Sequence, residues 1–238
     1  MSQDTVQMVA EAPAFRPLSD FAGTLSQRVY ASLKEAILDL SLRPGAILRK
    51  GDVCEALGVS RSPVSEAVAR LASEALVDIV PQAGTFVARL SLDEVREGAF
   101  LREALELAAV EEVARAITEE QLVELRRNLR LQEGLVADGD IRGFYAADAG
   151  FHELLLSFTG HRRLPGLSRT AWVHVDRARR LLLPEPGRVE ETLAEHRAIL
   201  AALEARDPEA ARAATRAHLR QVVTRLERLG TERPELFA

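Results

Sequence analysis

The chain has 238 residues, of which 47% are hydrophobic and 28% charged, enough apolar material for one large or two modest domains. No apolar run approaches the roughly 18 residues of a membrane span, and the N-terminus lacks the basic and apolar pattern of a signal peptide. The single cysteine, Cys54, excludes an internal disulfide framework. These features predict a cytoplasmic protein.

The net charge of −5 argues against a nucleic-acid partner, but the charge is unevenly distributed. Residues 21–90 carry eight Lys or Arg against seven Asp or Glu, so this segment is +1 and the rest of the chain is −6. DNA binding would therefore have to come from a few basic groups gathered on one face.

The first third of the chain has the pattern of a winged helix-turn-helix. Residues 1–22 lack periodicity and carry two prolines, which predicts a flexible arm. Within 23–90, apolar spacing predicts helices over 25–40, 50–57 and 62–74, with Gly58 ending the second helix. In the third, Ser62 is expected to cap the helix and Pro63 to be its first residue. The runs "LVDIV" and "TFVARL" around "PQAG" predict a hairpin.

Beyond Ser91 the chain is rich in Leu, Ala, Glu and Arg, which favours helices. Helices are expected over 92–116, 119–137, 140–158, 162–183, 188–205 and 207–229. Six helices with short joints predict an antiparallel bundle spanning 91–230, followed by a C-terminal tail over 231–238. The predicted fold is therefore mainly α, with an N-terminal winged helix-turn-helix and an all-α six-helix bundle.

Four polar side chains occupy helix faces that are otherwise apolar. Asp148 and His152 are four residues apart, so they point the same way. His196 and His218 lie on the leucine-rich stripes of two later helices. A single buried histidine is usually a satisfied core residue. Three histidines and one aspartate facing the same interior instead predict a site for a divalent ion such as Zn, Ni or Mn.

Two further side chains are candidates for binding an anion. Arg102 starts on an apolar stripe, and a buried guanidinium needs a partner such as a bidentate carboxylate. That partner is either a small-molecule effector or an acid of the bundle, such as Glu103 or Glu106. His174 also lies on an apolar stripe, and it either lines the same cavity or belongs to the core.

The segments "LSQRVYASLKEAILDLSLRPGAIL" and "LGVSRSPVSEAVARLASEALVDIVPQAGTFVARL" resemble the GntR family of bacterial transcription regulators. The helical half is similar to the FCD effector domain of its FadR-like branch. The resemblance implies a homodimeric regulator, a repressor in the leading interpretation, that binds a palindromic double-stranded operator. It also implies a small carboxylate effector beside a divalent metal, with Asp148, His152, His196 and His218 as the ligands. Six bundle helices rather than seven would indicate the metal-binding subgroup.

The resemblance also implies where DNA is contacted, namely the start of the third helix and the wing. The expected DNA-binding residues are Arg49, Lys50, Ser60, Arg61, Ser62, Ser65, Arg70, Gln82 and Gly84. Arg61 is expected to reach a guanine or a phosphate, whereas Arg49, Lys50 and Arg70 are expected to hold phosphates. Two positions depart from the family pattern, because Ser65 replaces an arginine and Ala75 replaces a glycine.

Two alternatives remain at this stage. The chain is the same DNA-binding regulator with a purely structural metal or an empty site, or it is a metal-dependent hydrolase. No motif for an additional general base, such as HExxH, is present. The sequence therefore predicts a regulator and not an enzyme.

Overall fold

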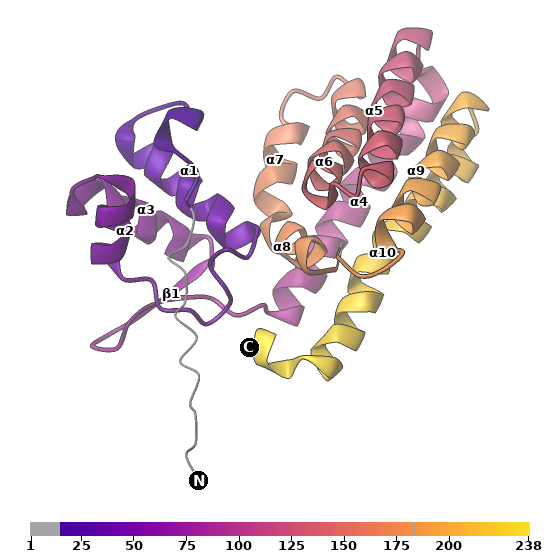
Figure 1. The fold of residues 1–238 in the computed structure, drawn as a ribbon. Coiled ribbons are helices and arrows are strands. Elements are labelled where there is room, and N and C mark those ends of the chain that lie inside the picture. The colour runs from indigo at the N-terminus through magenta and orange to yellow at the C-terminus, as the bar shows by residue number, and fades with distance from the viewer. Residues whose placement is uncertain (1–14, 183) are drawn as a thin grey trace. The chain divides into compact units, whose positions relative to one another are not determined.

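The computed structural model describes residues 15–182 and 184–238, and the chain divides into two compact units between Ala88 and Arg89 (Figure 1). The division lies two residues before the predicted boundary at 90/91. Residues 1–14 of the predicted arm lie outside the described residues.

The first unit is a winged helix-turn-helix, as predicted. The core of this unit is apolar, with Val29, Leu33 and Ile37 of the first helix and Val68 and Leu71 of the third all fully buried. In the antiparallel wing, Val77 pairs with Val87 and Val80 with Gly84. The elements are α1 (Leu25–Leu38), α2 (Lys50–Leu57), α3 (Arg61–Ser73), β1 (Val77–Val80) and β2 (Gly84–Val87).

The turn between α2 and α3 is partly as predicted. Gly58 ends α2 in the left-handed conformation, with φ of 64°, where glycine has no steric penalty. However, α3 begins at Arg61 with Ser60 as its N-cap residue, so the prediction that Ser62 caps the helix was wrong. Pro63 is the third helical residue and not the first. It is tolerated there because the first-turn N–H groups have no partner within the helix.

The described part of the predicted arm lies along α1. The Arg16 guanidinium pairs with Glu35 at 3.0 Å, and the Ser32 hydroxyl donates to the Arg16 carbonyl at 2.9 Å. A short 3-10 turn, Leu18–Asp20, precedes α1. Residues 15–22 are therefore anchored, contrary to the prediction of a flexible arm for this stretch.

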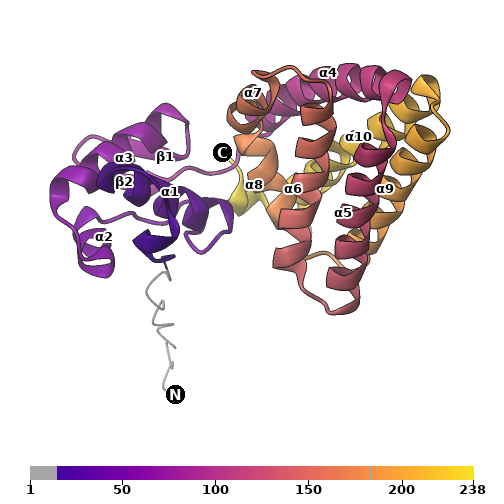
Figure 2. The same cartoon turned by 90° about the horizontal axis from the view of Figure 1, so that it is seen from above.

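The second unit is all-α, as predicted, and five of its helices form a closed ring of neighbours. In that ring α4 packs on α10, α10 on α9, α9 on α5, α5 on α6 and α6 on α4 (Figure 2). The remaining two helices, α7 and α8, pack on α4. The elements are α4 (Leu92–Ala116), α5 (Glu119–Ala137), α6 (Ile141–Phe158), α7 (Leu164–Ala171), α8 (Val173–Leu182), α9 (Arg188–Glu204) and α10 (Pro208–Glu232).

The described part of this unit has seven helices and not the predicted six, because the expected helix over 162–183 is divided at Trp172. Trp172 ends α7, its N–H donating to the Ser168 carbonyl at 3.0 Å, and its ring is buried in the core. Neither glycine nor proline marks the break, and the apolar spacing of the sequence continues across it. The helix count therefore gives no support to the metal-binding subgroup, and the metal prediction rests on the ligands.

The ends of the long helices follow from their capping residues. Thr118 and Gln121 form a reciprocal capping box at the start of α5, and Asp207 caps α10 with Pro208 as its first residue, as predicted. α10 continues to Glu232 and is followed by a 3-10 turn, Pro234–Leu236, so the predicted tail over 231–238 is structured. Among the described residues, no helix is both long and apolar enough to cross a membrane.

Candidate metal centre

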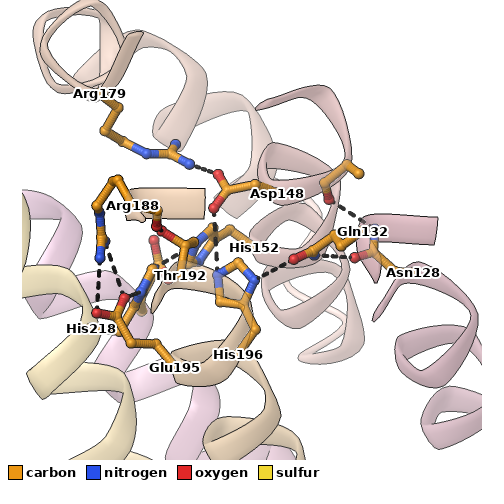
Figure 3. A network of polar contacts seen from close by, with 12 residues as sticks. Asn128, Gln132, Asp148, His152, Arg179, Arg188, Thr192, Glu195, His196 and His218 are labelled. Atoms are coloured by element: carbon orange, nitrogen blue, oxygen red, sulfur yellow. Dashed lines mark hydrogen bonds and ion pairs between the residues drawn. The ribbon is translucent and has the colours of Figure 1, made fainter. Parts of the chain in front are cut away.

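Four potential metal ligands meet inside the ring of helices (Figure 3). Asp148 and His152 come from α6, His196 from α9 and His218 from α10. Each is buried, with at most 5% of its surface exposed, and one ligand atom from each lies within 4.8 Å of all the others. The predicted set of four is therefore brought together.

Each histidine uses its Nδ1 atom to contact an oxygen outside the cluster. His152 Nδ1 lies 2.6 Å from Glu106 Oε2, and His218 Nδ1 lies 2.6 Å from Glu195 Oε2. His196 Nδ1 lies 2.9 Å from Gln132 Oε1. Because these oxygens accept hydrogen bonds, Nδ1 carries the proton in all three rings. The lone pair of each Nε2 is then directed into the cluster, the tautomer that metal ligation requires.

The orientation of the Gln132 amide is fixed by a chain of hydrogen bonds. Asn128 Nδ2 donates to the Ala147 carbonyl at 2.9 Å, which leaves Asn128 Oδ1 to accept from Gln132 Nε2 at 2.6 Å. Gln132 Oε1 is therefore left to accept from His196. A backbone carbonyl of α6 thus determines the tautomer of a histidine on α9.

The inner atoms of the cluster lack protein partners suited to them. Among the described residues, His196 Nε2 and Asp148 Oδ1 make no hydrogen bond, although they lie only 3.5 Å apart. His152 Nε2 and His218 Nε2 lie 3.1 Å apart, with lone pairs facing one another. A buried acceptor without a donor is costly. A divalent cation satisfies all of these acceptors together, so the residues fit a metal with nitrogen and oxygen ligands.

Burial also keeps the three imidazoles neutral. It lowers the pKa of His152 below its usual value, and it lowers the pKa values of His196 and His218 much further. Burial alone raises the pKa of Glu106, but the charge of Arg102 and the hydrogen bonds from His152 and Arg102 outweigh it and hold that pKa well below its usual range. The site therefore combines neutral nitrogen donors with an ionised outer carboxylate.

A pocket opens beside the cluster. Asp148 and His218 line it together with two cationic side chains, Arg179 and Arg188. Arg179 forms an ion pair with Asp148, and burial lowers its pKa to about 9, so the guanidinium remains charged at neutral pH. Arg188 pairs with Glu195 at 3.0 Å. The lining residues are Asp148, Arg179, Leu182, Arg188, Thr192, His218 and Val222.

The two residues predicted to bind the effector lie elsewhere. Arg102 Nε donates to Glu106 Oε1 at 2.6 Å, and its guanidinium lies 5.0 Å from the centre of the Trp172 ring. It therefore makes the acid pairing that the sequence left open as an alternative. His174 Nδ1 lies 3.3 Å from Glu94 Oε2. Neither Arg102 nor His174 lines the pocket.

The predicted DNA-binding residues all lie in the first unit. Ser60, Arg61 and Ser62 are exposed at the start of α3, and Ser65 is half-buried one turn later. Arg49 and Lys50 begin α2. In the wing, Gln82 and Gly84 are exposed at the turn.

Arg70 has contacts within the unit that the sequence did not predict. Its guanidinium lies 3.8 Å from the centre of the Tyr30 ring, and it pairs with Glu74 at 3.5 Å. The Tyr30 hydroxyl in turn donates to Glu74 at 2.6 Å. Arg70 thus joins α3 to α1 while half of its side chain remains exposed.

Sequence reasoning missed the residues that orient the histidines. Glu106 was expected only as an alternative partner for Arg102, and no role was predicted for Gln132 or Glu195. Gln132 is fully buried on the stripe of Leu122, Leu125 and Leu129 in α5. A polar residue on that stripe was the available signal.

Comparison with known proteins gives consistent matches along the chain. Residues 25–87 match the GntR family of bacterial regulatory proteins, and residues 97–221 match the FCD domain. A transcriptional regulator of the HTH type from an unstable DNA locus of Streptomyces ambofaciens is 38% identical over 210 residues, covering 88% of each chain.

Two further proteins are similar over most of their length. The HTH-type transcriptional repressor RspR of Escherichia coli is 30% identical over 214 residues, 90% of this chain and 94% of that protein. A solved structure described as a GntR transcriptional regulator from Rhodococcus sp. RHA1 is 29% identical with a TM-score of 0.72, covering 84% of this chain and 96% of that one. The matched proteins are transcription regulators and not enzymes, which confirms that prediction and sets the hydrolase aside.

Proposed function

Because the chain belongs to the GntR family of DNA-binding transcription regulators and carries an FCD domain, we propose that a divalent metal and a small anionic effector control its binding to an operator. The observation that carries this proposal is the common tautomer of His152, His196 and His218, whose Nε2 lone pairs converge beside Asp148. Such an arrangement prepares a metal site before the ion arrives.

Asp148, His152, His196 and His218 would hold the ion, which supplies a positive centre for the carboxylate of an effector when bound. Zn, Ni and Mn all accept imidazole with carboxylate ligands. Glu106, Gln132 and Glu195 orient the three imidazoles. Their own partners (Arg102, Asn128 and Arg188) keep them in place.

The effector is a small carboxylate in the pocket beside the metal. Arg179 and Arg188 lie on the pocket wall with Thr192, and guanidinium groups bind carboxylates through two parallel hydrogen bonds. This assigns the anion to Arg179 and Arg188 in place of Arg102 and His174. Neither Arg102 nor His174 lines the pocket, and Arg102 pairs with the buried Glu106.

On DNA, a homodimer presents two α3 helices and two wings to the half-sites of a palindromic operator. Arg61 reads a base or holds a phosphate, and Arg49, Lys50 and Arg70 hold phosphates. The regulator acts in the cytoplasm, and it is a repressor. The repressor assignment is supported by the name of its relative RspR.

The test uses a duplex that the purified full-length protein selects from a random library. Binding of the protein to this duplex is titrated at fixed moderate salt with chelator, with Zn²⁺, and with Zn²⁺ plus a series of small acids. The expected result is a change in operator affinity of about 5–150-fold, the usual range of such coupling. His196→Asn should abolish this change. Arg188→Gln should abolish the response to acid even at Zn²⁺ concentrations that saturate the site, which separates loss of the anion contact from weaker metal binding through Glu195. A structural metal predicts binding of Zn²⁺ with no change in operator affinity, and that outcome would overturn the proposal.

A further inference from the structure

The segment after α10 is bonded to the start of the helical unit through its backbone. The Leu90 N–H donates to the Leu236 carbonyl at 3.0 Å, and the Ala238 N–H donates to the Leu90 carbonyl at 2.9 Å. Leu90 and Phe237 form a parallel β-bridge. Both backbone polar groups of Leu90 are therefore used by residues 234–238, which we call the strap.

Side-chain packing holds the strap in place as well. Leu90 is only 2% exposed and belongs to an apolar cluster with Trp172 and Leu226, against which Phe237 packs. The strap also lies close to Gly230 of α10. A Cβ atom at Gly230 would lie 3.5 Å from Leu92 Cδ1 and 4.0 Å from the Phe237 ring. The strap is thus a packed element of the helical unit.

This contact shortens the joint between the two units to a single residue. The Ala88 N–H donates to the Leu76 carbonyl at 3.1 Å, so Ala88 is anchored in the first unit. Leu90 is anchored in the second unit by the strap. Between them lies Arg89, which is exposed.

The helix that leads into the strap also carries a wall of the candidate site. On one face of α10, His218 is a candidate metal ligand, and Val222 one turn later lines the pocket. Val222 and Leu226 belong to the same apolar cluster as Leu90. A continuous row of packed residues therefore runs from the site to the joint and offers a route for coupling between them.

We propose that the strap fixes Leu90 to the end of α10, so that Arg89 is the hinge and a displacement of α10 is passed directly to the chain entering the DNA-binding unit. Without the strap, residues 89 and 90 become a loose linker before the Ser91 cap of α4, and a change at the site no longer reaches the first unit. The restraint on Leu90 follows from the strap contacts alone. Its link to metal binding rests on the proposed function.

The restraint is tested by limited trypsin digestion of the full-length chain, because trypsin cleaves after Arg89 only when Leu90 leaves its partners. Fragments 1–89 and 90–238 are followed by mass spectrometry for the wild type, for a chain truncated after Arg233, and for Phe237→Ala. Cleavage at Arg89 should be at least about tenfold faster in both variants. Glu235→Ala, which changes an exposed side chain of the same segment, is the matched control and should cleave at the wild-type rate.

Cleavage after the exposed Arg61, in the first unit, serves as the internal reference and should be equal in all chains. Far-UV circular dichroism and urea denaturation show that the helical unit remains folded in each variant. Wild-type cleavage at Arg89 that is already as fast as in the variants would overturn the proposal.

The coupling is tested separately with one dye in each unit, on Cys54→Ser chains labelled at Ser73→Cys and Ser157→Cys. Zn²⁺ should shift the distance distribution of the wild type and leave the broadened distribution of the truncated chain unchanged. An equal shift in both would overturn the coupling, whereas failure to bind Zn²⁺ would count against the proposed function and leave the digestion test intact.

Discussion

His152 and His218 face each other with their Nε2 atoms 3.1 Å apart, while the Nδ1 atom of each lies 2.6 Å from a glutamate. Both protons are on the glutamate side, so the two inner nitrogens are acceptors with no proton between them. This repulsive pairing is relieved by a cation. The glutamates are therefore as much a part of the candidate metal centre as the four ligands.

The first prediction follows from the bond between Glu195 and His218. Glu195→Gln removes the charge that holds the Nδ1 proton, so the affinity for Zn²⁺ should fall about 10–100-fold. Competition with a metal-binding dye measures this directly. Glu103→Gln is the control, because Glu103 pairs with Arg220 at the surface and its loss should leave the affinity unchanged. Equal affinities for wild type and Glu195→Gln would show that the outer carboxylate has no role.

The second prediction concerns the pH dependence of stability in the metal-free protein. Burial lowers the pKa values of His152, His196 and His218 in the folded state, whereas unfolded histidine titrates near about 6.5. Below that pH the unfolded state binds more protons, so the free energy of unfolding should fall, by up to about 1.4 kcal/mol per pH unit for each histidine. Above about pH 6.5, the contribution of the three neutral, buried histidines to the free energy of unfolding is fully present.

Urea denaturation with chelator between pH 8 and 5 measures this slope. His196→Asn keeps a side chain that can bond to Gln132 and removes one titrating group, so its slope should be shallower than that of the wild type. Parallel curves for the two proteins would contradict the assignment of a neutral, buried His196.

The third prediction separates two roles for Arg102. Because Arg102 is 2% exposed and pairs with the buried Glu106, Arg102→Ala leaves an uncompensated charge. It should cost about 3–5 kcal/mol of stability. The loss should appear without any added acid, as a lower midpoint of urea denaturation. A variant of normal stability that no longer binds small acids would instead support the effector role expected from the sequence.

The sequence predicted the fold well where local signals are strong. Gly58 and Asp207-Pro208 marked helix boundaries with residues whose backbone preferences are distinctive. The division at Trp172 could not be predicted, because a buried aromatic ring ends α7 there without glycine or proline. Tertiary packing decided that boundary, and periodicity does not record it.

The candidate site shows the same contrast. Asp148, His152, His196 and His218 could be found because each interrupts an apolar stripe. The side chains proposed to bind the anion could not be assigned in the same way, because Arg102 and Arg179 both start from buried faces. Arg179 lines the pocket, whereas Arg102 pairs with Glu106 through an i,i+4 contact, and apolar spacing does not distinguish the two.

The fourth prediction concerns Ala75, which follows α3 with φ of 52°. An L-residue in this left-handed conformation costs about 1–2 kcal/mol. Glycine removes this cost, but it loses more backbone entropy on folding, which offsets part of the gain. Ala75→Gly should therefore stabilise the first unit by about 1 kcal/mol. Ala72→Gly, inside the last turn of α3, is the matched control and should destabilise by about 1 kcal/mol. Hydrogen exchange of the α1 and α3 amides measures both. Destabilisation by Ala75→Gly would show that the turn does not carry this strain.

The last prediction concerns Ser65, which is half-buried and lies one turn after the start of α3. A serine hydroxyl reaches less far than an arginine and carries no charge, so the base pairs facing this position should be read weakly. Ser65→Arg adds a guanidinium that can bond to the O6 and N7 atoms of guanine. Such a contact is worth about 1–3 kcal/mol of discrimination. Duplexes selected by this variant should gain a guanine at one position of each half-site.

The control for that selection is Ser73→Arg, which adds the same charge at the far end of α3, away from the proposed reading end. Because the added charge lies away from that end, it should leave the selected sequence unchanged and should alter binding to all duplexes to a similar extent, since general attraction to the phosphates carries no sequence information. If Ser65→Arg behaves in the same way as Ser73→Arg, with tighter binding and no change in the selected sequence, then position 65 faces the DNA backbone and does not read bases.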